Sequence, residues 1–252
     1  MISDICIGDD AEARLLACLR EKWGEVPTGL RSRSESSDLL ELNDKEFLEW
    51  WEFEFADGTT AEGYSMRGWY HELYARQFSG KRVADIGSGL GFDGVHFAKN
   101  GANVTFVDIV QSNLEVVRRI CRLYNIHNVD FVYLESLDVI DSVEMFDFIW
   151  CQGSMINAPF DFMKIECTKL LEHLKVGGRW IELGYPEERW LKEGRKSFET
   201  WGACTDGERT PWVEWYDLKK LRARLSSAQF ETVLAFNFHD NDFNWFDLKR
   251  IK

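Results

Sequence analysis

The segment covering residues 83–91 constrains the fold of this 252-residue chain more than any other part of it. An apolar run containing one acid, Asp85, is followed by glycines at alternate positions: Gly87, Gly89 and Gly91. An amphipathic segment, Phe92 to Lys99, comes directly after them. Glycine lets a backbone turn sharply and lie close to a ligand. The pattern therefore predicts a buried strand that turns into a helix beside a nucleotide-like ligand.

Two common nucleotide-binding patterns do not fit this turn. The dinucleotide pattern G-x-G-x-x-G needs a glycine at the position of Phe92, and the Walker loop needs a Gly-Lys-Ser/Thr that is absent here. The pattern that remains is D-x-G-x-G-x-G, which starts at Asp85.

A second acid follows the glycine turn at a spacing that suits a nucleoside. Residues 103–108 read as a strand that ends at Asp108. A carboxylate about 20 residues after such a turn can accept hydrogen bonds from both ribose hydroxyls. The same residue is also suited to cap the helix expected from Gln111 to Tyr124. Both roles stay open.

The rest of the chain alternates between expected strands and helices. Further strands are expected over 129–134, 146–151, 179–183, 230–238 and 242–251, and helices over 160–174 and 216–227. The pair Gly177-Gly178 is expected to provide the C-cap of the helix over 160–174. Such alternation predicts a mostly parallel sheet with helices on both faces.

Five elements over residues 81–184 resemble the class I S-adenosylmethionine-dependent methyltransferases. The resemblance is carried by the D-x-G-x-G-x-G turn, the Phe146-Asp147 start of the fourth strand and the L-K-x-G-G pattern from Leu174. It implies an α/β fold, namely a three-layer Rossmann-like methyltransferase fold whose mostly parallel sheet has its last strand antiparallel. It also implies S-adenosylmethionine as the cofactor, bound by a domain over 81–252.

The resemblance also implies which residues meet this cofactor. They are Arg67, Asp85, Gly87, Ser88, Gly89, Gly91, Asp108, Ile109, Glu135, Ser136, Cys151 and Gln152. In the family, the acid after the third strand meets the adenine amino group, and the backbone of its neighbour meets a ring nitrogen. Glu135 and Ser136 match these positions best, and Asp138 competes with Glu135.

Arg67 precedes the first strand of the core, where related enzymes cover the methionine end of the cofactor. A guanidinium fork suits the cofactor carboxylate. The alternative is a surface arginine stacked on Trp69 or Tyr70.

The sequence does not identify a general base. Many relatives carry a histidine shortly after the fourth strand, whereas this chain has Asn157, which cannot take a proton. By position, Asn157, His71, His239 and Asp240 are weak candidates for a catalytic role, and each also has a structural interpretation.

Two regions lie outside the expected core. Residues 1–80 are expected to form a helical and hairpin extension that caps the cofactor domain, with a helix over 11–23, a loop over 29–38 and a hairpin from the alternation at 50–58. The insertion, defined here as residues 185–215, carries four tryptophans and follows the fifth strand. It is either a local aromatic cluster or a lid over the substrate, since long structureless connections are usually functional.

Composition limits the class of substrate. The formal net charge of −13 disfavours nucleic acid, because phosphate binding depends on Lys and Arg. The six cysteines show no C-x-x-C pair and read as buried thiols of a reducing compartment, and the five histidines suggest no metal site. With neither a signal peptide nor a run of about 20 apolar residues, a cytoplasmic protein without membrane contact is expected.

These observations predict an enzyme that transfers a methyl group from S-adenosylmethionine to an O or N atom of a small polar metabolite, such as a sugar or a natural-product intermediate. The alternatives are a protein or RNA nucleoside methyltransferase, and a non-catalytic protein that binds S-adenosylmethionine. The sequence does not indicate the oligomeric state.

Overall fold

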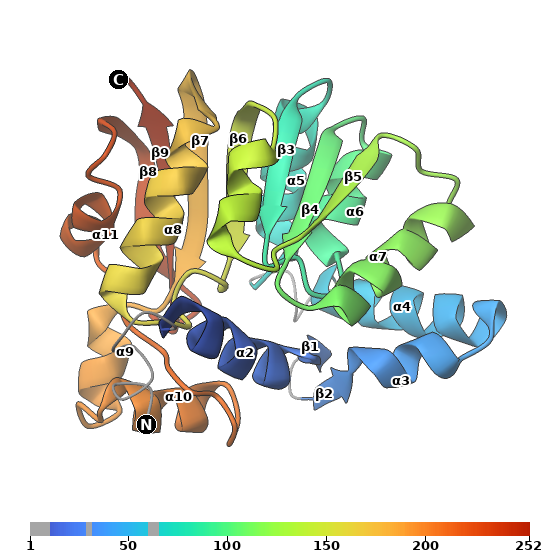
Figure 1. The fold of residues 1–252 in the computed structure, drawn as a ribbon, viewed down its shortest axis with the longest axis horizontal. Helices are drawn as coiled ribbons and strands as arrows, with labels where there is room; N and C mark the ends of the chain where they lie inside the picture. The colour runs from blue at the N-terminus through green and yellow to red at the C-terminus, as the bar shows by residue number, and fades with distance from the viewer. Residues whose placement is uncertain (1–10, 29–31, 60–65) are drawn as a thin grey trace. The chain divides into compact units, whose positions relative to one another are not determined.

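The computed structural model describes residues 11–28, 32–59 and 66–252 (Figure 1). By their internal contacts these residues divide into two compact units. Within the described ranges, the glycine-turn unit lies between Trp23 and Tyr133, and the insertion unit comprises Ala11–Lys22 together with Leu134–Lys252.

The glycine-turn unit contains three parallel strands in the order β5-β4-β3. Its elements are β1 (Glu25–Thr28), β2 (Ser32–Glu35), α3 (Ser36–Glu41), α4 (Asp44–Thr59), α5 (Gly68–Phe78), β3 (Arg82–Ile86), α6 (Phe92–Lys99), β4 (Asn103–Asp108), α7 (Gln111–Leu123) and β5 (Val129–Tyr133). Strands β3 and β4 are apolar and buried almost throughout, as expected for strands covered on both faces. Helices α6 and α7 both contact β4, and α5 packs on α6 (Figure 1).

The insertion unit contains four strands in the order β6-β7-β9-β8. Its elements are α2 (Ala11–Trp23), the 3-10 helix η2 (Leu137–Ser142), β6 (Phe146–Gln152), α8 (Phe160–Glu172), β7 (Leu174–Gly184), α9 (Glu187–Lys192), α10 (Phe198–Thr205), α11 (Leu218–Arg224), β8 (Phe230–Phe238) and β9 (Phe243–Arg250). Strands β6 and β7 are parallel, whereas β9 runs antiparallel to both β7 and β8. The expected α/β class, with mostly parallel strands and an antiparallel last strand, is confirmed.

The glycine pair after α8 does not form the predicted helix cap. Helix α8 ends at Glu172 with His173 as its C-cap, and Gly177 and Gly178 lie within β7. The pairing of β6 with β7 shifts register between Phe146 and Phe148. A Cβ on Gly178 would lie 2.8 Å from the carbonyl oxygen of Asp147, so the glycines serve an irregular strand pairing.

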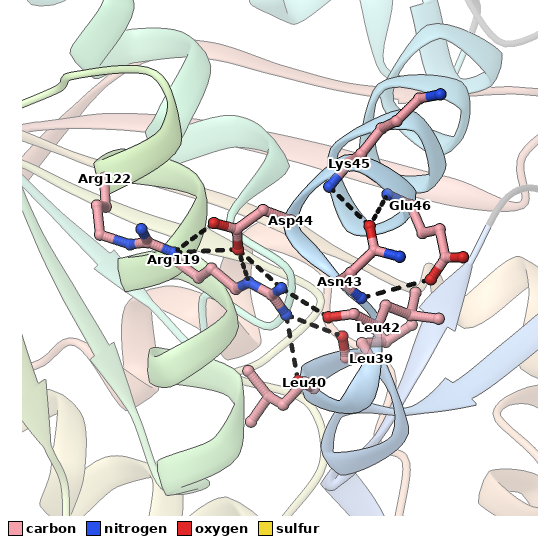
Figure 2. A network of polar contacts seen from close by, with 9 residues as sticks. All are labelled: Leu39, Leu40, Leu42, Asn43, Asp44, Lys45, Glu46, Arg119 and Arg122. Atoms are coloured by element: carbon pink, nitrogen blue, oxygen red, sulfur yellow. Dashed lines mark hydrogen bonds and ion pairs between the residues drawn. The ribbon is translucent and has the colours of Figure 1, made fainter.

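The hairpin predicted over 50–58 is wrong, because these residues belong to helix α4. Asn43 starts the helix: its Oδ1 accepts hydrogen bonds from the backbone N–H of Lys45 at 3.1 Å and of Glu46 at 3.0 Å. Glu46 Oε2 in turn accepts from the N–H of Asn43 at 3.4 Å, which completes a capping box (Figure 2). Along the helix, Phe47 and Trp51 are buried four residues apart.

Arg119 of α7 connects this helix to both α3 and α4 (Figure 2). The Arg119 guanidinium donates to Asp44 Oδ1 at 2.9 Å and to the carbonyl oxygens of Leu40 and Leu42 at 3.2 and 2.6 Å. It therefore binds backbone carbonyls that the end of α3 leaves without helical partners. Arg122, one turn further along α7, also binds Asp44.

The N-terminal segment holds further differences. The helix over 11–23 is confirmed. The only hairpin found in the described part of this segment is β1–β2, where a loop over 29–38 was predicted; residues 29–31 of that loop lie outside the described residues. No helix within the described ranges is long and apolar enough to cross a membrane.

Candidate functional site

The glycine turn has the backbone conformation that its sequence predicts. Gly87, Gly89 and Gly91 all have positive φ, at 68°, 51° and 71°. Gly91 is the N-cap of α6, and a Cβ there would lie 2.8 Å from the side chain of Val117. Any other residue at Gly91 would thus be strained in its backbone and would clash with α7.

A fourth glycine, Gly94, lies in the first turn of α6, and sequence reasoning missed it. A Cβ on Gly94 would lie 2.3 Å from the ring of Phe106 and 2.5 Å from Asp85 Oδ2. Helix α6 therefore lies directly against strands β3 and β4. The sequence signal was a glycine three residues after Gly91 in an otherwise helical segment, which is typical of close helix–strand packing.

Asp85 is a buried acid with an unsatisfied oxygen. Only 3% of the residue is exposed, and its carboxylate accepts a hydrogen bond from the N–H of Gly94. Its Oδ2 atom has no hydrogen-bond partner within the described part of the chain. Burial, reinforced by the nearby charge of Asp93, raises the pKa of Asp85 well above its ordinary value. A buried acceptor of this kind suits a donor or cation that arrives with a ligand.

Asp108 joins the end of β4 to the glycine turn. Its Oδ2 accepts a hydrogen bond from the N–H of Gly89 at 2.9 Å, and its Oδ1 accepts one from the N–H of Val110 at 2.8 Å. The N-cap of α7 is Val110, so Asp108 is not the N-cap that the sequence left open as its alternative role. Burial raises the pKa of Asp108 to about 6, against the opposing effect of these hydrogen bonds. Asn113 Nδ2 also donates to Oδ1, at 3.3 Å, so both backbone and side-chain donors hold this carboxylate at the end of β4.

Arg67 lies close to this turn, beside α6. Its Nε is 3.7 Å from Asp93 Oδ1, and its guanidinium lies over the ring of Phe92 at 4.9 Å from the centroid. Tyr70 also hydrogen-bonds to Arg67. The candidate base His71 is buried, with its Nε2 2.6 Å from the same Asp93 oxygen. Sequence reasoning did not single out Asp93, which is one of two acids in the segment from the glycine turn to α6.

In the insertion unit, the predicted adenine contacts lie on a loop held by α2. Arg20 Nη2 donates to the carbonyl oxygens of Leu134 at 3.0 Å and of Glu135 at 2.5 Å. Glu135 is exposed and Ser136 is half-buried, immediately before η2. The competing acid, Asp138, forms an ion pair with Lys169 at 3.1 Å.

The end of β6 carries uncharged polar groups that lack partners. Both side-chain amide atoms of Gln152 and the Nδ2 of Asn157 are buried with no hydrogen-bond partner among the residues described. Cys151 is fully buried, and desolvation raises the pKa of its thiol well above the ordinary value, so the group is a neutral thiol. The turn between β8 and β9 holds the other candidates: His239 pairs with Asp242 at 3.5 Å, and His239 and Asp240 have φ of 51° and 55°.

The insertion packs on the segment that follows β6 and is not structureless, since it contains α9 and α10. The N–H of Glu214 donates to the carbonyl oxygen of Ile156 at 2.9 Å, and Glu214 Oε2 accepts from the N–H of Phe160 at 3.0 Å. The two ends of the excursion meet where the N–H of Tyr216 donates to the carbonyl oxygen of Tyr185 at 2.9 Å.

Comparison with known proteins identifies similar chains. Residues 83–178 match the family model of the methyltransferase domain. The mitochondrial ubiquinone biosynthesis O-methyltransferase of Schizosaccharomyces pombe is 31% identical over 107 residues, which are 41% of this chain and 38% of that protein. The present chain therefore matches about two-fifths of the length of that relative.

Solved structures show the same fold at low identity. A putative O-methyltransferase from Nostoc punctiforme has a TM-score of 0.58 and 16% identity, covering 77% of this chain and 59% of that one. The 1,6-didemethyltoxoflavin-N1-methyltransferase of Burkholderia thailandensis, solved with 1,6-didemethyltoxoflavin and S-adenosylhomocysteine, has a TM-score of 0.56 and 18% identity, covering 90% and 94%.

Proposed function

We propose that the chain is a class I S-adenosylmethionine-dependent methyltransferase, which transfers the methyl group of S-adenosylmethionine to an O or N atom of a small polar molecule. The observation that carries this proposal is the glycine turn with Asp108 bound to its backbone at Gly89. When bound, the cofactor supplies an activated methyl group on a sulfonium.

The residues around the turn fit this cofactor. Asp108 ends β4 beside the turn, where ribose hydroxyls can replace a long hydrogen bond such as that from Asn113 Nδ2 at 3.3 Å. Asp85 has an unsatisfied buried oxygen that suits the cofactor ammonium. Arg67 supplies a guanidinium for the carboxylate. In the insertion unit, Glu135 is proposed to meet the adenine in preference to Asp138, whose carboxylate is bound by Lys169.

The acceptor is proposed to bind beside the end of β6. Gln152 and Asn157 present uncharged hydrogen-bonding groups there, which suit a polar molecule. The insertion, anchored to this segment through Glu214, is proposed to act as a lid. Alignment of acceptor and methyl group can supply about 7–11 kcal/mol of the barrier reduction. Since Asn157 cannot remove a proton, we favour a nucleophile that needs little help from a base, such as a neutral amine.

The cofactor assignment is tested by titrating S-adenosylhomocysteine into the wild-type protein and into Asp108→Ala by calorimetry. We expect Asp108→Ala to weaken binding by about a hundredfold, because two charge-assisted hydrogen bonds are lost. Asp130→Ala, which removes an exposed acid from β5, is the matched control and should bind like wild type. Equal affinity of Asp108→Ala and wild type would refute the ribose assignment.

The acceptor assignment is tested on the same protein with labelled S-adenosylmethionine and fractionated cell extract. Methyl label should enter the small-molecule fraction rather than RNA or protein. Replacing residues 186–215 with a short Gly-Ser linker between Tyr185 and Tyr216 should abolish this incorporation and preserve cofactor affinity. Loss of both would contradict a separate lid, and absence of any incorporation by wild type would favour a non-catalytic binding protein.

A further inference from the structure

Three side chains from α5, its N-cap and α6 form a linked set beside the glycine turn. Asp93 lies in the first turn of α6, two residues after Gly91, and only 9% of its side chain is exposed. One of its oxygens, Oδ1, is 2.6 Å from His71 Nε2 and 3.7 Å from Arg67 Nε. The histidine is therefore at hydrogen-bonding distance, whereas Arg67 Nε lies beyond it and is held there by charge.

The surroundings of His71 fix its ring. Only 2% of the residue is exposed. The imidazole stacks on His96 at 4.6 Å and on Phe55 at 5.7 Å, with interplanar angles of 13° and 15°. Phe55 and His96 also stack on each other at 5.9 Å, so His71 belongs to a packed cluster of three rings that holds its Nε2 near one oxygen. The hydrogen bond in turn fixes the rotamer of Asp93.

Arg67 differs from these two in its freedom. Its side chain is 30% exposed. A guanidinium has five N–H donors, so the contact of Nε with Asp93 and a hydrogen bond donated to Tyr70 still leave donors for a bidentate anion. A carboxylate that arrives with a ligand can therefore bind Arg67 without first breaking a close hydrogen bond between Nε and Asp93.

From this geometry we infer that Asp93 and His71 are positioning residues, which place Arg67 for the carboxylate of the cofactor's amino-acid moiety. The inference rests on the proposed function, and it adds a second layer to it: His71 fixes Asp93, and Asp93 fixes Arg67. With Asp85 across the turn, the site offers one cation and one buried acceptor, which are complementary to a zwitterion.

The test compares two ligands that share an adenosyl group. S-adenosylhomocysteine carries the amino-acid moiety, and 5′-methylthioadenosine lacks it. Asp93→Asn should weaken binding of S-adenosylhomocysteine by about tenfold and leave binding of 5′-methylthioadenosine within about twofold of wild type. Arg67→Met should show the same selective loss, and adding Asp93→Asn to Arg67→Met should cause little further loss.

Two substitutions of His71 keep the inference testable if Asp93→Asn does not fold. His71→Gln keeps an N–H donor near the position of Nε2 and should retain the ratio of the two affinities. His71→Phe keeps the stacked ring without a donor and should lower that ratio several-fold. Equal losses for both ligands, or an unchanged ratio in His71→Phe and Asp93→Asn, would overturn the inference.

The same titrations separate this inference from the proposed function. If Asp108→Ala weakens binding of both ligands while Asp93→Asn changes neither affinity, the result supports the cofactor site and contradicts the positioning role of Asp93 and His71. If the wild-type protein binds neither ligand, the proposed function itself falls, and the positioning role falls with it.

Discussion

Asp108, which we propose binds the cofactor ribose, illustrates how a single buried acid can oppose stability. It is 4% exposed, and burial raises the pKa of its carboxyl to about 6. An acid whose pKa is higher in the folded than in the unfolded state binds more protons when folded. The free energy of unfolding therefore falls as pH rises from about 4, near the unfolded pKa, to about 6.

Asp108→Asn should remove this pH dependence, because the amide is similar in size and does not ionise. Between pH 4 and pH 7, the free energy of unfolding of Asp108→Asn should rise relative to that of wild type by up to about 3 kcal/mol, because only wild type loses stability over this range. Urea denaturation of both proteins across this range measures the difference. Asp130→Asn is the exposed control, and a relative stability of Asp108→Asn that does not change with pH would contradict the prediction.

Helix α4 shows how an element is set by its first turn. Asn43 caps two backbone N–H groups, and Glu46 returns a hydrogen bond to the N–H of Asn43. Asn43→Ala should destabilise the protein by about 1 kcal/mol, because the two capped N–H groups lose their acceptor. Asn43→Asp keeps an acceptor and should be nearly neutral. Thermal unfolding measures the stability of both variants. If the two are equally stable, the acceptor at residue 43 does not contribute to stability.

The same helix shows where sequence reasoning failed among the elements. The alternation of aromatic and acidic residues from Trp50 to Phe55 fits a strand period, but the buried pair Phe47 and Trp51 fits a helix. The capping box at Asn43 was the deciding signal, and it lies seven residues before the misleading stretch. Strands β3 and β4 were predicted correctly because each is a short, mostly buried and apolar run next to polar or glycine residues.

The candidate site was predictable only where its residues adjoin strand ends. Asp85 and Asp108 end or nearly end β3 and β4, so their place follows from the strand pattern alone. The pairing of His71 with Asp93 spans 22 residues, and that of Arg20 with Glu135 spans 115. Such contacts arise from how elements pack, and no local pattern in a single sequence encodes them.

For the whole molecule, the net charge of −13 bears on the class of acceptor. We expect no measurable binding of single-stranded or hairpin RNA at about 0.15 M salt, because the 43 acidic residues outnumber the 30 Lys and Arg and repel the phosphates. Fluorescence anisotropy with labelled RNA tests this expectation over a salt series. RNA binding that weakens steeply with salt would reveal a basic site, and it would favour the alternative that the protein is an RNA nucleoside methyltransferase.

The hydrogen bond between Tyr216 and Tyr185 has a consequence for how such a chain can diversify. Tyr185 and Tyr216, at the two ends of the insertion, are hydrogen-bonded to each other, so the distance between its ends does not fix its length. A segment of different length can therefore connect Tyr185 to Tyr216 without displacing the strands. If the insertion is the proposed lid, changes in its sequence can alter the choice of acceptor while the glycine turn and Asp108 keep their contacts.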